Sequence, residues 1–316
     1  MSTPERMRQF KDVSTEISKA YLGRTTLVEY MLASLIAQGH ILLEGVPGVA
    51  KTTLVKAFAA SLSIHFQRIQ FTPDLLPADI TGSYLFNMRD QAFDLRKGPL
   101  FANIVLADEI NRAPAKTQSA MLEAMAEQQV TIEGERHPLP PPFMVLATQN
   151  PIEQEGVYPL PEAQLDRFLM KFQLGFPPRE IERAMLRTYR KTPESPDPVV
   201  DIQTILSWQH DVESVHVTEE LEEYLLDLVA YTRNHRSILL GVSPRGTLGL
   251  LRAARALAFV RGRDYVVPDD IRAMAVPVMA HRLIIQPEAE MEGLRGEQII
   301  QEALQRIVVL RRDPPA

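Results

Sequence analysis

The 316-residue sequence contains no cysteine. Disulfide bonds, thiolate nucleophiles, iron–sulfur clusters and Cys-ligated zinc are therefore excluded. The sequence also lacks a long apolar run: the best stretch, residues 30–43, is interrupted by Gln38, Gly39 and His40, so we expect no membrane span. The first residues, MSTPERMRQFKD, are polar and lack the apolar core of a secretory signal. We expect a protein of the reducing cytoplasm.

An excess of basic residues is missing as well. The chain has 34 Lys and Arg against 40 Asp and Glu, a formal net charge of −6. Proteins that coat nucleic acid favour clustered Lys and Arg, so this balance argues against that class. The 7 histidines are scattered without the spacing of metal ligands. Composition is that of an ordinary globular protein, and the length suggests about two domains.

The first half of the chain alternates predicted strands with predicted helices. Short apolar runs predict buried strands at residues 40–44, 66–71, 103–107, 142–148 and 168–174. Helical spacing predicts helices at residues 15–38, 52–62 and 117–128. Two hairpins are predicted near residues 84–95 and 130–135. Alternating strands and helices indicate an α/β fold with a parallel sheet covered by helices on both faces.

The pattern changes after Gly175-Phe176-Pro177-Pro178, because helical spacing dominates from there to the end of the chain. We therefore place a domain boundary near Pro177. Residues 1–177 are predicted to form the α/β domain, and residues 178–316 a smaller, all-helical domain.

One segment between a predicted strand and a predicted helix has the composition of a phosphate-binding loop. Its residues are Gly45, Val46, Pro47, Gly48, Val49, Ala50, Lys51 and Thr52, followed by Thr53. A glycine-rich turn lets several N–H groups approach a phosphate, and the start of the next helix adds partial positive charge. In this pattern Lys51 reaches the β- and γ-phosphates and Thr52 ligates Mg²⁺. The segment predicts ATP and Mg²⁺ as ligands.

This loop departs from the general pattern G-x-x-x-x-G-K-[ST] at one position, where Ala50 replaces the second glycine. Gly48 remains for the tight turn. We expect the extra methyl group to be tolerated if position 50 already has a helical φ.

Two acids follow a second apolar run. Residues 104–107 predict a central strand, and Asp108 and Glu109 come directly after it. Ligands of open α/β sheets bind at the carboxyl ends of the strands. We expect Asp108 to hold Mg²⁺, directly or through water, and Glu109 to orient and deprotonate the attacking water.

Several longer motifs then resemble those of MoxR-type AAA+ ATPases. They are LADEINRAPAKTQSAMLEAM (residues 106–125), ATQNP (147–151), LPEAQLDRF (160–168) and GVPGVAKT (45–52), and the resemblance runs from about residue 22 to residue 268. Ala50 is usual in that family. The resemblance implies an AAA+ P-loop NTPase core with a helical lid and the hydrolysis of ATP to ADP and phosphate.

The resemblance also implies roles for residues outside the phosphate loop. Asn150 matches sensor 1, whose amide holds the attacking water against the γ-phosphate. Arg167 matches the arginine finger, which enters the site of a neighbouring subunit. The alternative for Arg167 is a solvated side chain paired with Asp166. Arg112 is a second candidate for a trans or sensor role.

In the helical domain, Ser243 is a good N-cap and Pro244 suits the first helical position, which puts Arg245 at a defined helix start. Arg245 matches sensor 2, which senses the γ-phosphate from the lid; the alternative is a capping turn with a surface arginine. Leu22-Gly23-Arg24 matches the adenine-side turn of the family, with Tyr21 and Leu22 as possible pocket walls.

The resemblance further implies a homo-oligomer, a hexameric ring, with a chaperone-like role in maturing partner proteins, typically ones with von Willebrand factor A domains. The two predicted hairpins match inserts that face the ring centre; the alternative is that they are solvated loop tips. Two other functions remain open. One is a nucleic-acid motor or loader, although the hairpin tips carry no basic stripe. The other is an ATP-gated binding switch without turnover, against which Glu109, Asn150 and Arg167 argue.

Overall fold

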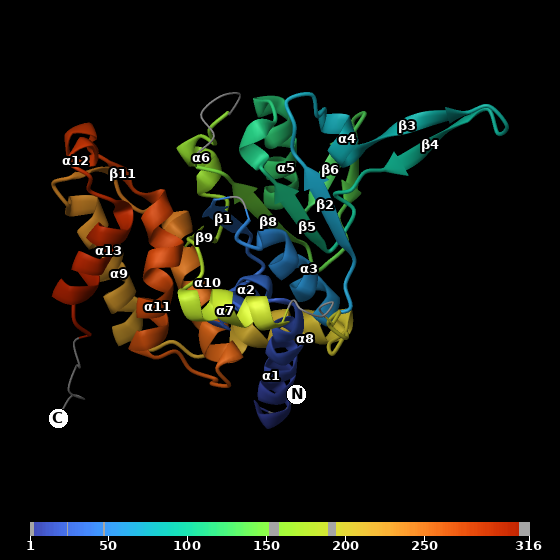
Figure 1. Ribbon diagram of the computed structural model, residues 1–316. Coiled ribbons are helices and arrows are strands. Elements are labelled where there is room, and N and C mark those ends of the chain that lie inside the picture. The colour runs from blue at the N-terminus through green and yellow to red at the C-terminus, as the bar shows by residue number, and fades with distance from the viewer. Residues whose placement is uncertain (1–2, 24, 47, 152–157, 189–193, 310–316) are drawn as a thin grey trace.

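The computed structural model describes residues 3–309 except 24, 47, 152–157 and 189–193. Figure 1 shows a sheet with helices on both sides, a helical region beside it, and one hairpin that projects away from the body. The helices are α1 (Thr3–Ala20), α2 (Thr25–Ile36), α3 (Lys51–Ser61), α4 (Pro77–Thr81), α5 (Ala115–Glu127), α6 (Glu162–Leu165), α7 (Arg179–Thr188), α8 (Ile202–Asp211), α9 (Glu219–Asn234), α10 (Pro244–Val260), α11 (Pro268–Met279), α12 (Pro287–Met291) and α13 (Gly296–Arg306). Short 3₁₀ turns are η1 (Ile110–Arg112), η2 (Val212–Ser214) and η3 (Ala280–Arg282).

The central sheet confirms the predicted α/β fold. Its strands are β1 (Ile41–Gly45), β2 (Phe66–Gln70), β5 (Ile104–Asp108), β8 (Met144–Gln149) and β9 (Met170–Leu174). Their order is β2-β5-β8-β1-β9, and every neighbouring pair is parallel. All the predicted strands therefore exist, and their carboxyl ends meet at one edge.

Alternation along each strand divides the core into two hydrophobic clusters, one on each face of the sheet. In β5, Ile104 and Leu106 join the cluster that contains α1, α2 and α3, whereas Val105 and Ala107 join the cluster that contains α5. Successive side chains of a strand point to opposite faces, so a strand buried on both sides has to be apolar throughout. That requirement explains the continuous apolar runs of the sequence.

The helical spacing over residues 15–38 belongs to two helices, not to one continuous helix. The chain forms α1 and α2 with a break at Tyr21–Gly23. A Cβ atom at position 23 would meet the Tyr21 ring, which would have to turn away. The apolar spacing continues across the break because Ile17 and Met31 are both buried in the same cluster, which is why the pattern resembled a single helix.

Both predicted hairpins are present. The longer one consists of β3 (Gly82–Asn87) and β4 (Ala92–Lys97), and the shorter one of β6 (Gln129–Ile132) and β7 (Glu135–Pro138). They contact each other, since the Tyr84 hydroxyl donates to a Glu135 carboxylate oxygen at 2.6 Å. In Figure 1 the longer hairpin is the element that projects from the sheet domain.

The region after residue 178 is helical, as predicted, with one addition. β10 (Ile238–Leu240) and β11 (Ile284–Ile285) form a small antiparallel pair, which is too short to give a periodic signal. The N-terminal helix α1 also reaches this region, because the Phe10 and Trp208 rings lie 4.5 Å apart. The chain passes from β9 to α7 around Pro177, where the domain boundary stays a prediction. Within the described ranges, no helix combines the length and apolar character needed to cross a bilayer.

Candidate nucleotide site

The predicted phosphate loop connects β1 to α3 at the carboxyl edge of the sheet. Pro47 lies outside the described residues. Gly48 has a φ of +84°, and a Cβ there would meet nothing within 4 Å. Ala50 has a φ of +59°, in the left-handed region, so a right-handed helical φ, at which the methyl group would cause no strain, is not found at this position. A left-handed backbone costs a residue with a side chain about 1–2 kcal/mol, and it occurs here at the N-cap of α3.

Lys51 is the first residue of α3, and its ammonium group lies inside the curve of the loop. Its Nζ donates a hydrogen bond to the Gly45 carbonyl oxygen at 2.6 Å. Burial lowers the pKa of Lys51, and the negative charges of Asp108, Glu109 and Glu44 oppose that shift. A half-buried cation beside the first N–H groups of a helix, which lack intrahelical partners, suits a bound phosphate.

Asp108 and Glu109 lie next to this loop at the end of β5. The buried Asp108 accepts hydrogen bonds at Oδ2 from Arg68 Nη2 at 2.6 Å and Nε at 3.0 Å. Glu109 accepts at Oε2 from Gln70 Nε2 at 2.8 Å and from Arg112 Nη1 at 3.0 Å. Both acids are therefore held by neighbouring side chains of the same chain.

Thr148, on β8, connects the two acids. Its hydroxyl donates to Asp108 Oδ1 at 2.6 Å and accepts from the Glu109 backbone N–H at 2.8 Å. Thr148 is fully buried, so no solvent replaces these bonds. Glu109 has a left-handed φ of +58°, and the bond to its N–H holds this unusual backbone.

Sequence reasoning missed Arg68, Gln70 and Thr148. Their signal lay in strand pairing: β2 runs parallel to β5 with Gln70 opposite Asp108. Asn150, which was predicted, follows β8 directly and is buried. Because β8 lies between β5 and β1, the structure brings Asn150 to the edge between the acids and the phosphate loop.

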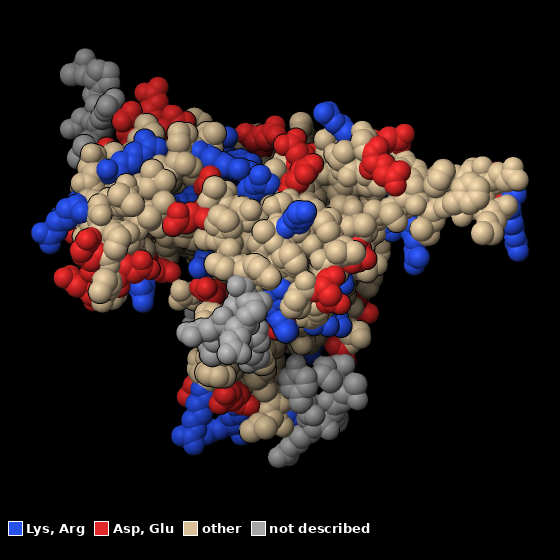
Figure 2. All heavy atoms as spheres, turned by 90° about the horizontal axis from the view of Figure 1, so that it is seen from above, with Lys and Arg blue, Asp and Glu red and all other residues tan. Residues whose placement is uncertain are grey.

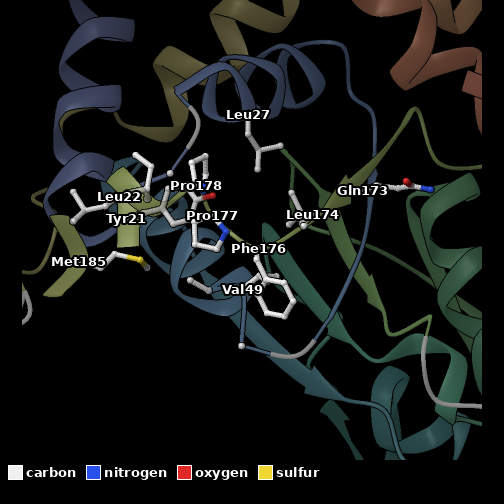
Figure 3. Close-up of a pocket in the computed structure, with 15 residues that line it drawn as sticks. Tyr21, Leu22, Leu27, Val49, Gln173, Leu174, Phe176, Pro177, Pro178 and Met185 are labelled. Carbon is white, nitrogen blue, oxygen red and sulfur yellow. The ribbon is translucent and has the colours of Figure 1, made fainter. Parts of the chain in front are cut away.

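A cavity of about 310 Å³ adjoins the phosphate loop (Figure 3). Tyr21, Leu22 and Gly23 line one side, Val49 and Ala50 belong to the loop, and the segment 173–178 with α7 completes the wall. The lining is mainly apolar, and this volume is at the lower end for sites that bind small molecules. It therefore suits a flat heterocyclic base.

The placement of Leu22 and Gly23 agrees with their predicted adenine-side position, while Arg24 lies outside the described residues. The contributions of Phe176, Pro177, Pro178, Ile181 and Met185 were missed. Their signal was the Gly-Phe-Pro-Pro stretch, which sequence reasoning used only to mark a domain junction.

Arg167 and Arg245 are not part of this site. Both line a second cavity, of about 160 Å³, together with His40, which directly precedes β1. A five-residue strand extends about 16 Å, and β1 separates this cavity from the phosphate loop. The structure thus places both arginines at the edge of the sheet opposite their own phosphate loop.

The contacts of Asp166, Arg112 and Ser243 show which of the alternatives for the arginines hold. Asp166 pairs with Arg282 at 2.7 Å and not with Arg167. Arg112 contacts Glu109 of its own chain. The Ser243 hydroxyl accepts from the Gly246 N–H at 3.2 Å and Pro244 is the first residue of α10, which confirms the predicted start of that helix.

Comparisons with known proteins agree with this architecture. The family model described as "ATPase family associated with various cellular activities (AAA)" matches residues 40–170, and an AAA lid domain model matches residues 230–303. The uncharacterized protein YeaC of Bacillus subtilis is 47% identical over 295 residues, covering 93% of this chain and 92% of YeaC. Chaperone MoxR1 of Mycobacterium tuberculosis is 45% identical over 303 residues, covering 93% and 80%.

A solved structure is similar over nearly the whole chain. The crystal structure of a candidate ATPase from Cytophaga hutchinsonii superposes with a TM-score of 0.91 at 42% identity, and the match covers 98% of this chain and 97% of that one. The arrangement of sheet, phosphate loop and lid is therefore shared with a protein of the same length class and not only with isolated domains.

Proposed function

Since this chain belongs to the MoxR-type AAA+ ATPases, we propose that it hydrolyses ATP to ADP and phosphate and uses the reaction to mature or remodel partner proteins. One observation carries the catalytic part: the phosphate loop, Asp108, Glu109 and Asn150 converge at one edge of the parallel sheet. This edge then holds donors for phosphate, ligands for a cation and a candidate proton acceptor. It lies beside a cavity that suits the heterocyclic ring of a nucleotide.

Each residue has a chemical task in this proposal. Lys51 and the loop N–H groups bind the phosphates. Thr52 and Asp108 would hold Mg²⁺, which neutralises phosphate charge when bound. Asp108 can take this role because a carboxylate has about four lone-pair sites, and the contacts to Thr148 and Arg68 use only part of them.

Glu109 would accept the proton of the attacking water, and the Asn150 amide would orient that water. Glu109 Oε2 is engaged by Gln70 and Arg112, so it has to exchange at least one of these contacts for the water. A base that is held away from the γ-phosphate until the site is assembled would limit unproductive turnover.

Arg167 and Arg245 would complete the site of a second subunit. Their location at the opposite edge of the sheet supports action in trans, because a head-to-tail contact between copies brings that edge to a neighbour's phosphate loop. A cation that stabilises the transferring phosphoryl group contributes about 10³–10⁵ in rate, or about 4–7 kcal/mol. Head-to-tail contacts that close form a ring, and we propose a hexamer.

The substitution Glu109→Gln tests the catalytic part. We expect the variant to bind ATP and retain it, with phosphate release near background, because the amide cannot accept the proton. Retained nucleotide is measured by filter binding with labelled ATP, and phosphate release by a coupled assay. Glu123→Gln, at an exposed position of α5, is the matched control and should behave as the unsubstituted chain. Unchanged turnover in Glu109→Gln would contradict the proposed base and favour a binding switch without catalysis.

The proposed clients are proteins with von Willebrand factor A domains. The Glu109→Gln variant with ATP should hold them in the assembled state, and Lys51→Ala should not. Figure 2 shows a projecting hairpin that is mainly uncharged on this face, with isolated basic side chains rather than a stripe. DNA binding that weakens with salt and stimulates the ATPase would instead support a nucleic-acid motor. A cytoplasmic location stays a prediction.

A further inference from the structure

The cavity lined by Arg167 and Arg245 is called here the arginine pocket. Two further arginines, Arg252 and Arg282, also line it. Its volume is about 160 Å³. This is room for about five water molecules at ~30 Å³ each, and it is below the ~300 Å³ at which sites for whole small molecules begin. The arginine pocket therefore suits a phosphate-sized group better than a complete nucleotide.

The charge in the arginine pocket is unbalanced. Four arginines and one aspartate line it, which leaves a formal charge of +3. The aspartate, Asp166, already pairs with Arg282, whose side chain is only 3% exposed. His40 adds no positive charge near neutral pH, because burial lowers its pKa to about 4. Across the described part of the chain, Arg167, Arg245 and Arg252 have no acidic partner within ion-pair distance.

Arg252 is placed to act with Arg245. The two residues are seven positions apart on α10, which is about two helical turns, so they share one face of the helix. Both side chains are exposed and can meet a second molecule. Partial burial of its guanidinium group lowers the pKa of Arg252, and the nearby positive charge of Arg245 lowers it further.

We propose that Arg252 is a third arginine that contacts the phosphates of the ATP bound by the neighbouring subunit, beside Arg167 and Arg245. The inference rests on the proposed function, because it needs the site shared between subunits. The triphosphate of an ATP bound to the neighbouring subunit would account for a phosphate-sized cavity with excess positive charge. The adenine and ribose of that ATP stay on the neighbouring subunit, so this cavity does not need room for them. Guanidinium groups also match the geometry of phosphate oxygens.

A mixing experiment tests this assignment. Lys51→Ala subunits lack a working phosphate loop but keep the arginine pocket, whereas Arg252→Ala subunits keep the loop but lack one arginine. Alone, Arg252→Ala should lose about 10- to 100-fold in turnover, the range for a charged hydrogen bond. Random mixing of equal amounts leaves about one head-to-tail interface in four complete. We therefore expect the mixture to recover about a quarter of the unsubstituted turnover per subunit.

A role for Arg252 within its own subunit gives a different result. If Arg252 only packs α10 against the sheet domain, its loss damages the subunit that carries the substitution. In the mixture every intact phosphate loop then belongs to a damaged subunit, and mixing would restore no ATP turnover. That outcome would overturn the inference. Arg252→Gln, which keeps the apolar stem, goes through the same mixing test, so a folding defect of Arg252→Ala does not decide the question.

Two further measurements separate this inference from the proposed function. Arg167→Ala is mixed with Lys51→Ala in parallel: rescue of Arg167→Ala without rescue of Arg252→Ala rejects only the role of Arg252, whereas failure of both rejects the shared site. In the Glu109→Gln background, Arg252→Ala should weaken ATP-driven assembly in sedimentation velocity. Arg306→Ala, which removes an exposed arginine paired with Glu302 on α13, should not. Equal assembly with and without Arg252 would contradict the inference.

Discussion

Removal of one buried hydroxyl group should disturb both acids of the candidate site. Thr148→Val keeps the shape of the side chain but removes the donor to Asp108 Oδ1 at 2.6 Å and the acceptor of the Glu109 N–H at 2.8 Å. A buried N–H without a partner costs about 1–3 kcal/mol, and the lost bond to a carboxylate about 1.5–3 kcal/mol. Since Thr148 is fully buried, we expect a loss of about 2.5–6 kcal/mol in the free energy of unfolding of the sheet domain.

Thr148→Ser is the matched control, because it keeps the hydroxyl and removes one methyl group, worth about 1 kcal/mol. Both variants are compared by urea unfolding followed by circular dichroism, and by phosphate release under saturating ATP. Thr148→Val should be the less stable of the two by a few kcal/mol and the slower ATPase, because the backbone of Glu109 at a φ of +58° loses its support. Equal stability and equal turnover of the two variants would refute the bridging role of Thr148.

Three further predictions concern the loop, the cation site and the protonation of the core. Ala50→Gly should raise the free energy of unfolding by up to about 1 kcal/mol, and with it the melting temperature, because glycine has no steric penalty at a φ of +59°. A lower melting temperature in calorimetry would contradict this. Arg68→Gln should lower the Mg²⁺ concentration needed for half-maximal binding of fluorescent ATP, because Arg68 no longer competes for Asp108 Oδ2; a higher requirement would count against competition. The pKa of His40 is lowered from 6.5 to about 4, so the unfolded chain binds a proton between these values that the folded chain does not. Stability should therefore fall as the pH drops from about 6.5 to about 4, by about 3 kcal/mol at most, and His40→Gln should show a shallower decline in urea titrations at several pH values.

The parts of the fold that sequence reasoning predicted are those with a local cause. The strands of a parallel sheet are buried on both faces and are therefore apolar throughout, so β1, β5 and β8 could be identified from short apolar runs. The phosphate loop is a contiguous pattern, and the start of α10 follows from Ser243 and Pro244. In each case the physical requirement acts within a few residues of the chain.

The parts that were missed depend on contacts between distant residues. Thr148 and Arg68 become functional only because β8 and β2 flank β5 in the sheet, an order that no single segment encodes. Ala50 has its left-handed backbone at the N-cap of α3, where the loop joins the helix. The location of Arg245 opposite its own phosphate loop depends on how α11 and η3 of the lid pack against β9 and α6, and helical spacing within the lid carries no information about that packing.

The claim that two chains share one catalytic site is tested most directly by the ATP turnover of the unsubstituted protein as a function of its concentration. The oligomeric state is followed in the same samples by mass photometry. Because Arg167 and Arg245 lie at the edge opposite their own phosphate loop, turnover per chain should fall steeply as assemblies dissociate into single chains. Turnover per chain that stays constant in a fully monomeric sample would contradict the account.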